Sequence, residues 1–218
     1  MTTSPALERI YAADRELRAA EIELMREGDG LTKLLADAVA DAKKLDEGEE
    51  RHMRLERLSD LCAQVPGPEM ADALISILDE LEPRVRRAAG EALLDVTYDY
   101  YAEVARAIDR ALDRDATGLA MRELPFILAE VNEPGAIKQL KRFMKSRSAE
   151  VVAAAIEASV EMMEPDLQAA IAELMDDERQ VTVADIDDEE TTTIGELATD
   201  AHHALGALDD LDDLEDED

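Results

Sequence analysis

Apolar residues recur at helical intervals along almost the whole chain. Ser4 and Pro5 indicate a helix start, because serine favours the N-cap and proline the first helical position. Apolar positions then follow near the helical period up to Gly28, which predicts one long amphipathic helix in the first 30 residues. A second helix is predicted from about residue 32 to 45.

Beyond Gly48, apolar-periodic stretches of about 12–16 residues alternate with short turns. Prolines mark several of the breaks, because proline cannot continue a helix but begins one well. No convincing alternation of the kind that a half-buried strand shows interrupts these stretches. The fold class predicted is therefore all-α, with helices near 50–64, 68–80, 84–96, 98–113, 117–131, 134–146, 149–163 and 165–176.

Small residues on one face of these helices recur with a period. Three segments share a face of alanines: VRRAAGEALLDV (85–96), VVAAAIEASVEM (151–162) and LATDAHHALGAL (197–208). Weaker echoes begin at Met53 and Leu119, so that the units up to Val151 follow one another at intervals of about 32–34 residues. One helical hairpin per interval of this length is typical of an α-solenoid.

The segment ALISILDELEPRVRRAAGEALLDV (73–96) resembles a HEAT repeat of the short bacterial kind, also found in phycobilisome-lyase-like proteins. The resemblance lies in the apolar first helix, the acidic-proline turn, the Val-Arg start and the small-residue second helix. It is good over 68–96, fair over 134–163 and 165–208, and poor over 50–65 and 98–131, where Pro125 falls inside an expected helix. It implies a solenoid of about five HEAT-like hairpins, and it implies no reaction.

The family often forms a ladder between an Asp in the turn and a basic residue that starts the second helix. In this sequence Arg54 and Arg86 match the basic position, whereas Ala120 and Val152 do not. We therefore expect no continuous ladder.

Three parts of the chain are predicted on this basis. Residues 1–30 form an N-terminal capping helix and residues 31–208 the HEAT-like repeat domain. An acidic insertion, DDERQVTVADIDDEETTT (176–193), lengthens the last unit and reads as a loop with a short extended segment. Residues 209–218 carry eight acidic residues and no basic one, a composition typical of a disordered acidic tail, although Leu211 and Leu214 allow a further helical turn.

The charge balance argues against several classes of function. Acidic residues number 54 and basic residues 23, for a net charge of −31, which opposes binding to nucleic-acid phosphates and to anionic membranes. No apolar run is long enough for a transmembrane helix, and the first residues lack the apolar core of a secretory signal. Cys62 is the only cysteine, which favours a reducing compartment, so we expect a cytoplasmic protein. A salt-adapted cytoplasm is an alternative explanation of the acidity.

Residues with catalytic or metal-binding chemistry form no recognisable motif. Cys62 falls on an apolar helix face and is expected to behave as a small hydrophobe. His202 and His203 are adjacent and point apart on a helix, so no zinc site is expected. The carboxylates of residues 185–190 could attract a cation, but they lack the spacing of a calcium loop. We therefore expect no catalytic residue, no cofactor and no metal.

Two groups of residues are candidates for partner binding. Lys138, Lys141, Arg142 and Lys145 share one face of a predicted helix and contain half of the chain's lysines. This stripe is either a solvated face paired with neighbouring acids or a docking strip. Three of the four tyrosines lie together at Tyr98, Tyr100 and Tyr101, as partly buried core residues or, if exposed, as interface anchors.

These observations favour a non-enzymatic interaction scaffold that binds a protein partner through its repeat surface. The partner would be basic or would carry a charged docking segment. Two alternatives remain: a bilin-type lyase or isomerase accessory protein, as the family resemblance implies, and an acidic chaperone or nucleic-acid mimic that shields a basic partner.

Overall fold

The computed structural model describes residues 4–184 and 189–215. These residues are mostly helical, with ten α-helices, two short 3-10 segments (η1 and η2) and two short strands. In chain order the elements are α1 (Pro5–Leu24), η1 (Met25–Gly30), α2 (Leu31–Ala42), α3 (Glu49–Ala63), α4 (Pro68–Leu78), α5 (Pro83–Asp113), α6 (Ala120–Val131), α7 (Pro134–Phe143), α8 (Ala149–Glu161), η2 (Pro165–Leu167), α9 (Gln168–Ala172), β1 (Gln180–Ala184), β2 (Glu189–Thr193) and α10 (Ile194–Glu215).

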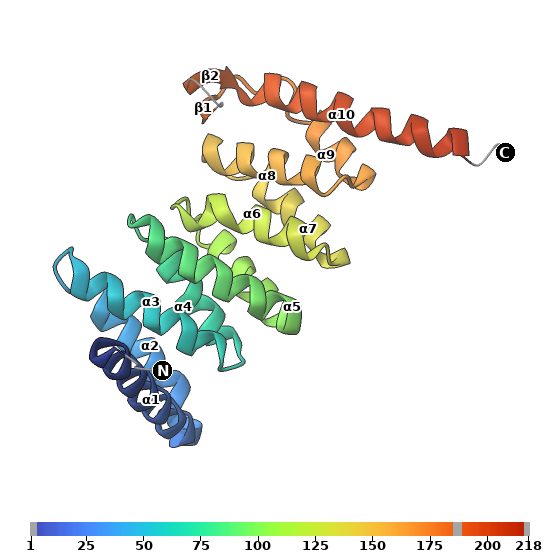
Figure 1. Cartoon of the computed structure of the whole chain (residues 1–218). Helices are drawn as coiled ribbons and strands as arrows, with labels where there is room; N and C mark the ends of the chain where they lie inside the picture. Colours follow the sequence, from blue (N-terminus) through green and yellow to red (C-terminus); the bar gives the residue numbers. More distant parts are fainter. Residues whose placement is uncertain (1–3, 185–188, 216–218) are drawn as a thin grey trace.

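From α2 onward the helices pack in succession in two layers (Figure 1). One layer contains α2, α4, the second half of α5, α7 and α9. The other contains α3, the first half of α5, α6, α8 and α10. Consecutive helices alternate between the layers, so the chain advances by helical pairs, each of which packs on the next.

Turn residues set most of the helix boundaries as predicted. Pro68, Pro83 and Pro134 each occupy the first helical position of α4, α5 and α7. Gly67 precedes Pro68 with a φ of 135°, a conformation that side chains rarely adopt. The prediction of helix starts at these prolines is confirmed.

One predicted boundary is wrong. Helices expected at 84–96 and 98–113 are a single helix, α5, with one non-helical residue at Tyr100 (φ −138°, ψ 46°). Neither glycine nor proline lies near this point, and the Thr97 hydroxyl donates to the Leu93 carbonyl at 2.6 Å, inside the helix. The change of direction is therefore local, and the two halves of α5 belong to successive helical pairs.

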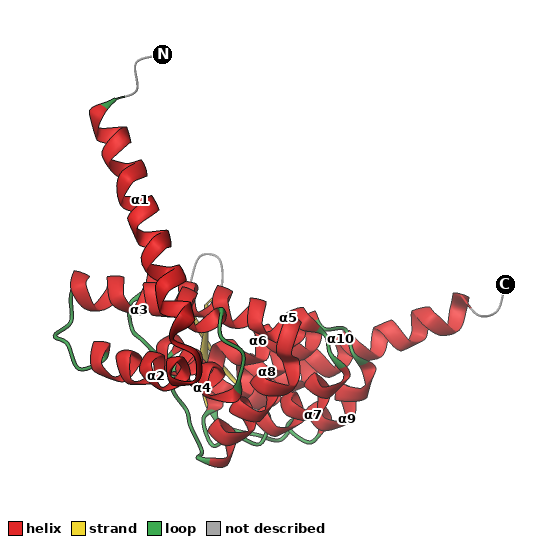
Figure 2. Cartoon of the chain, turned by 90° about the horizontal axis from the view of Figure 1, so that it is seen from below, coloured by secondary structure: helices red, strands yellow, loops and turns green. Residues whose placement is uncertain are grey.

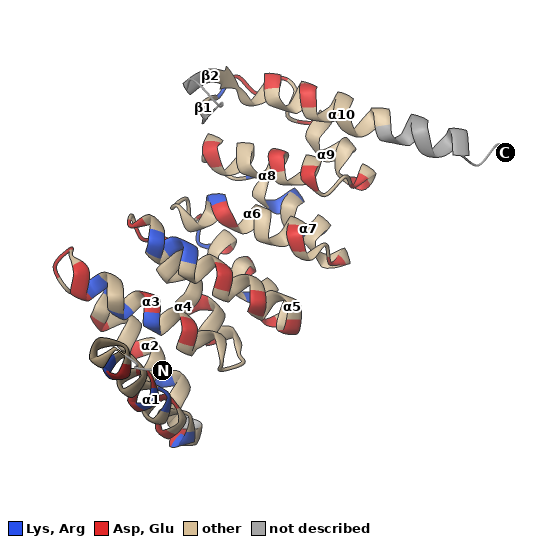
Figure 3. Ribbon diagram, viewed as in Figure 1, with Lys and Arg blue, Asp and Glu red and all other residues tan. Residues whose placement is uncertain are grey.

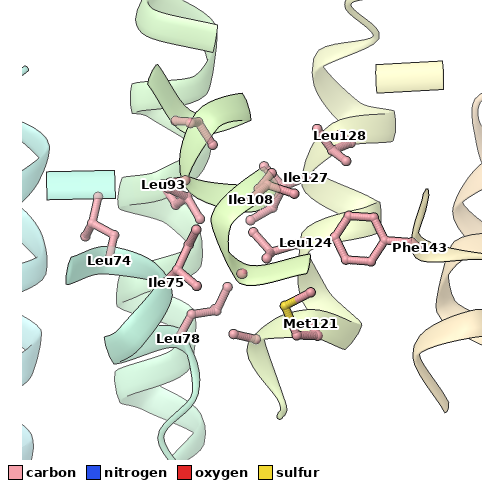
Figure 4. Packing of buried hydrophobic residues seen from close by; sticks show 14 of the residues in the cluster. Leu74, Ile75, Leu78, Leu93, Ile108, Met121, Leu124, Ile127, Leu128 and Phe143 are labelled. Carbon is pink, nitrogen blue, oxygen red and sulfur yellow. The ribbon is translucent and has the colours of Figure 1, made fainter. Parts of the chain in front are cut away.

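A continuous apolar core joins the two layers. Figure 4 shows its central part, where leucine, isoleucine and methionine side chains of α4, α5 and α6 interdigitate and Phe143 closes the far side. The small residues predicted to face neighbouring helices are buried, with Ala89 and Ala155 fully inaccessible. These alanines let helix backbones approach closely.

The N-terminal helix does not cover the first helical pair along its length. No side chain of α1 is buried, and Figure 2 shows the helix extending away from the other helices. Its contacts with them are confined to its C-terminal end, where Leu24 packs on the core and Glu21 pairs with Arg57 at 3.1 Å. Gly28, with a φ of 65°, turns the chain between α1 and α2. Capping by residues 1–30 is therefore restricted to the end of α1 and to η1.

The acidic insertion contains the expected extended segment. β1 and β2 pair antiparallel, with Thr182 opposite Thr191, and Val181 is buried where β1 contacts α8. Residues 185–188 lie outside the described residues. The helix that follows, α10, continues to Glu215, so most of the segment predicted as a disordered tail is helical, and only 216–218 lie outside the description. No proline or glycine follows Gly206 to end the helix earlier.

Candidate functional site

The candidate site is the outer face of α7. Ala136, Leu140 and Phe143 are buried against the core, together with Gln139. The helical period then directs Lys138, Lys141, Arg142 and Lys145 away from the core, the last of these from the turn that follows α7. We call Lys138, Lys141 and Lys145 the lysine strip.

Arg142 has a structural role. Its guanidinium binds the carboxylates of Asp109 and of Asp113, the latter at 2.5 Å, both on the second half of α5. Partial burial lowers the pKa of Arg142, but the hydrogen bonds to Asp113 and Asp109 outweigh that effect and raise it above its ordinary value. This residue therefore holds α7 onto α5 through two ion pairs.

The lysine strip differs from the other lysines of the protein. Lys33, Lys43 and Lys44 each pair with a carboxylate, at 2.6, 3.2 and 2.8 Å. Among the residues whose side chains the structure describes (4–28, 30–182 and 191–207), none of the strip lysines lies within 4.0 Å of a carboxylate oxygen. Lys138 and Lys145 are exposed and Lys141 is half-buried.

A shallow groove follows the strip along α7. The strip lysines and Arg142 form one side, Pro134 and Ile137 add apolar surface, and Asp166 of η2 lies at the edge. Lys138, Lys141 and Lys145 follow one another at three and four residues, so their ammonium groups line one side of the helix. The arrangement presents several positive charges to a ligand with regularly spaced carboxylates.

The three tyrosines do not form one surface. Tyr101 is half-buried: its hydroxyl donates to the Gln139 side chain at 3.3 Å, and its ring packs so closely on Gly135 that a Cβ there would lie 2.6 Å from the hydroxyl oxygen. Burial, followed by the charges of Glu133 and Asp109, raises the pKa of Tyr101 to about 12. Tyr101 thus joins α5 to α7 from the inner side and is not an exposed anchor.

Tyr98 and Tyr100 remain exposed, at 55% and 44%. The Tyr98 hydroxyl lies 3.4 Å from a carboxylate oxygen of Glu130 on α6, and its pKa is raised by partial desolvation and by that charge. The contacts of Tyr98 therefore lie with α6, whereas the lysine strip faces η2.

A second groove, which the sequence did not indicate, lies between the first half of α5 and α6. Leu94, Phe126 and Ile127 form its apolar floor, and Gly90 leaves room between the two helices. Glu91, Glu123 and Glu130 surround this floor, with Arg86 and Arg87 at one side. The apolar residues that line it also satisfy the helical period, so nothing in the sequence separated them from core positions.

Inter-helix ion pairs also join successive helical pairs. Arg110 of α5 binds Asp72 of α4 at 2.6 Å, and Arg142 of α7 binds Asp109 and Asp113 of α5. The residues expected to occupy the basic ladder position make other bonds: Arg54 pairs within its own helix, and Arg86 donates to the Leu81 carbonyl at 2.7 Å. The pairs therefore link first helices of successive units, with residues that the family pattern did not indicate.

Reactive residues are placed as follows. Cys62 is fully buried, and burial raises the pKa of its thiol to about 12, which keeps it protonated and unreactive near neutral pH. The rings of His202 and His203 lie 6.2 Å apart and are steeply inclined. No group of three His, Cys, Asp or Glu side chains in the described part of the chain could hold a metal ion, and Asp185, Asp187 and Asp188 lie outside that part.

No protein-family model matches the chain, and no curated protein matches it in sequence. Among the described helices, none combines the length and apolar character needed to cross a membrane.

Proposed function

We propose that the protein is a non-enzymatic interaction scaffold that binds an acidic segment of a protein partner through the lysine strip. The observation that carries this proposal is the absence of ion-pair partners for Lys138, Lys141 and Lys145 among the described residues. In a chain with a net charge of −31, these three neighbouring lysines form a local positive patch, which favours an acidic segment over a basic one.

The fold supports the same function. We propose that the helical pairs from α2 to α10 form an α-solenoid of five HEAT-like hairpins, in the cytoplasm of the cell. A stack of this kind presents extended surfaces to a partner, because each unit contacts only its neighbours and leaves two long faces open. The lysine strip lies on such a face, at the fourth pair.

The expected interaction is weak and multivalent. A single exposed ion pair contributes about 0–1 kcal/mol, and salt screens it. Three lysines along one groove, together with the apolar surface of Ile137, would act additively on a segment that alternates carboxylates and leucines. The sequence DDLDDLEDED at the end of this chain has that pattern, so the tail of the protein is a suitable probe and a competitor for the partner.

The groove between α5 and α6 favours a second kind of ligand on the same scaffold. Its apolar floor and its surrounding Glu91, Glu123 and Glu130 are complementary to an amphipathic segment with basic residues. The general acidity of the protein would steer such a basic segment toward it. A scaffold with both sites could hold an acidic and a basic segment on separate surfaces.

A peptide with the sequence of residues 209–218 tests the lysine strip directly. Its binding to the full chain, and to a chain that ends at residue 208, is measured by fluorescence anisotropy at increasing salt. We expect the triple variant Lys138→Glu, Lys141→Glu, Lys145→Glu to lose binding, and salt to weaken binding to the wild type. The matched control, Lys33→Glu with Lys44→Glu, reverses two exposed lysines that already have partners and should bind as the wild type does.

Equal binding by the triple variant and the control would show that the strip is a solvated face. Arg142 is left unchanged in both, because its bonds to α5 would confound binding with stability.

A further inference from the structure

Over most of its length, helix α1 carries an apolar face that its own chain leaves uncovered, and only Leu24 at its C-terminal end packs on the core. None of its side chains is buried, and Ile10 and Leu17 are 61% and 37% exposed. A helix of 20 residues that stands apart from a core is marginally stable in water, since most helical stability in proteins comes from packing. We therefore expect this face to pack against a partner.

Large and small apolar residues alternate along the face at intervals of four and three residues. This spacing is that of a coiled-coil seam, which keeps one stripe toward a partner helix. A shallow groove passes beside the small residues Ala6 and Ala13. The exposed large positions of the seam are Ile10 and Leu17, and the small positions are Ala6, Ala13 and Ala20. Leu24 continues the same spacing but packs on the core.

We propose that α1 pairs in antiparallel orientation with α1 of a second copy of this chain. In one register, both exposed large residues meet an alanine: Ile10 of one copy faces Ala20 of the other, and Leu17 faces Ala13. The same register satisfies both copies, as a two-fold interface requires. The seam is thus complementary to itself, and no other segment is needed to cover it.

The flanking charges agree with this orientation. Arg9 and Glu23 lie on the same side of the seam at opposite ends of α1, and the antiparallel register places Arg9 of each copy beside Glu23 of the other. A parallel pair would instead place alanine on alanine in three layers and leave gaps there. The antiparallel pair also keeps the two bodies about 30 Å apart, the length of a 20-residue helix.

We expect added salt to strengthen the association of the two α1 helices. Each copy carries a net charge of −31, and Glu16 of one copy faces Glu16 of the other across the two-fold axis, so repulsion opposes an apolar seam. The lysine strip has the opposite salt dependence. This inference therefore stands or falls independently of the proposed function.

Sedimentation of the full chain over a range of concentrations tests the pairing. We expect a dimer that tightens with added potassium chloride. Leu17→Glu places a charge in the centre of the seam and should raise the dissociation constant at least about tenfold, because two charges would be desolvated. Ile22→Glu is the matched control: Ile22 is 56% exposed on the side of α1 away from the seam, and the substitution should leave the dimer unchanged.

The orientation is tested by oxidising mixtures of single-cysteine variants, since Cys62 is buried and does not compete. A mixture of Ile10→Cys and Ala20→Cys should form the mixed disulfide, and neither variant alone should form a dimer by disulfide. A chain that stays monomeric at every concentration and salt, an equal effect of the two glutamate variants, or a disulfide between two copies of Ile10→Cys would each overturn the proposal.

Discussion

Two neighbouring basic residues of α7, Lys141 and Arg142, differ in whether they form ion pairs with another helix. Arg142 reaches Asp109 and Asp113 across the helix interface, where a planar guanidinium can serve two carboxylates at once. Lys141, one residue earlier, has no carboxylate oxygen within 4.0 Å among the side chains that the structure describes. The helical period predicted the shared face of these residues. It could not predict their difference, because the acids that decide it belong to a helix about 30 residues earlier.

Buried alanines are the residues whose size the packing constrains most tightly. Ala89 and Ala155 are fully inaccessible, on helices that contact neighbours in the same layer. Replacing either by leucine adds three carbons where no space exists, and should lower the free energy of unfolding by roughly 1–3 kcal/mol. Urea unfolding followed by circular dichroism measures this change.

A control for α5 is Ala102→Leu, at an exposed position of the same helix, for which little change is expected. Neutral behaviour of both Ala89→Leu and Ala155→Leu would mean that these interfaces are looser than the structure has them.

Elements whose ends depend on local chemistry could be predicted from the sequence, and elements whose position depends on distant contacts could not. The starts of α4, α5 and α7 follow from prolines and their preceding residues. The amphipathic pattern of α1 predicted a helix correctly, but amphipathicity does not say which surface covers the apolar side. Residues 1–30 contact the first pair only at the end of α1 and through η1, a restriction that the amphipathic pattern could not show.

Arg179 is one of the residues that attach the β-hairpin insertion to the neighbouring helices. Arg179 bonds Asp177 at 2.6 Å and also donates to the Ser146 carbonyl at 2.9 Å, in the turn between α7 and α8. Hydrogen bonds from the Arg179 side chain hold the pKa of Asp177 below its ordinary value of 3.8. A carboxylate with a lowered pKa stabilises the folded state above its ordinary pKa, and this contribution is lost as the pH falls through the lowered value.

The variant Asp177→Asn should therefore destabilise the protein by about 1 kcal/mol at pH 7. The difference from the wild type should shrink as the pH falls below 3.8, where the wild-type carboxylate itself becomes protonated. Thermal unfolding between pH 7 and pH 3 measures both. Asp176→Asn, at an exposed neighbour, is the matched control. A difference between Asp177→Asn and the wild type that does not change with pH would contradict the role of this charge.

At the scale of the whole molecule, acidic side chains are spread over nearly every helix while basic ones are fewer (Figure 3). This distribution follows directly from the composition, and so does the expectation that the surface repels other anions. The candidate sites depend on departures from the average: three lysines without an ion-pair partner among the described side chains, and an apolar floor between glutamates. Such departures become visible only when the partners of each side chain are known.

The same distribution predicts how the stability of the whole molecule depends on salt. Folding brings carboxylates together on a surface with a net charge of −31, and this repulsion is weaker in the expanded unfolded chain. Ions shorten the range of the repulsion from about 10 Å at 0.1 M salt to about 3 Å at 1 M. The inter-helix pairs such as Arg110 with Asp72 weaken at the same time, but few pairs exist compared with the excess of acids. We therefore expect the melting temperature to rise from low salt to molar potassium chloride, with most of the rise below about 0.5 M, where screening changes fastest.

Sucrose at matched osmolality separates this screening from general exclusion effects, since it leaves the charges unscreened. A melting temperature that is the same at low and molar salt would show that the packed core outweighs the repulsion, and would remove salt adaptation as the explanation of the acidity.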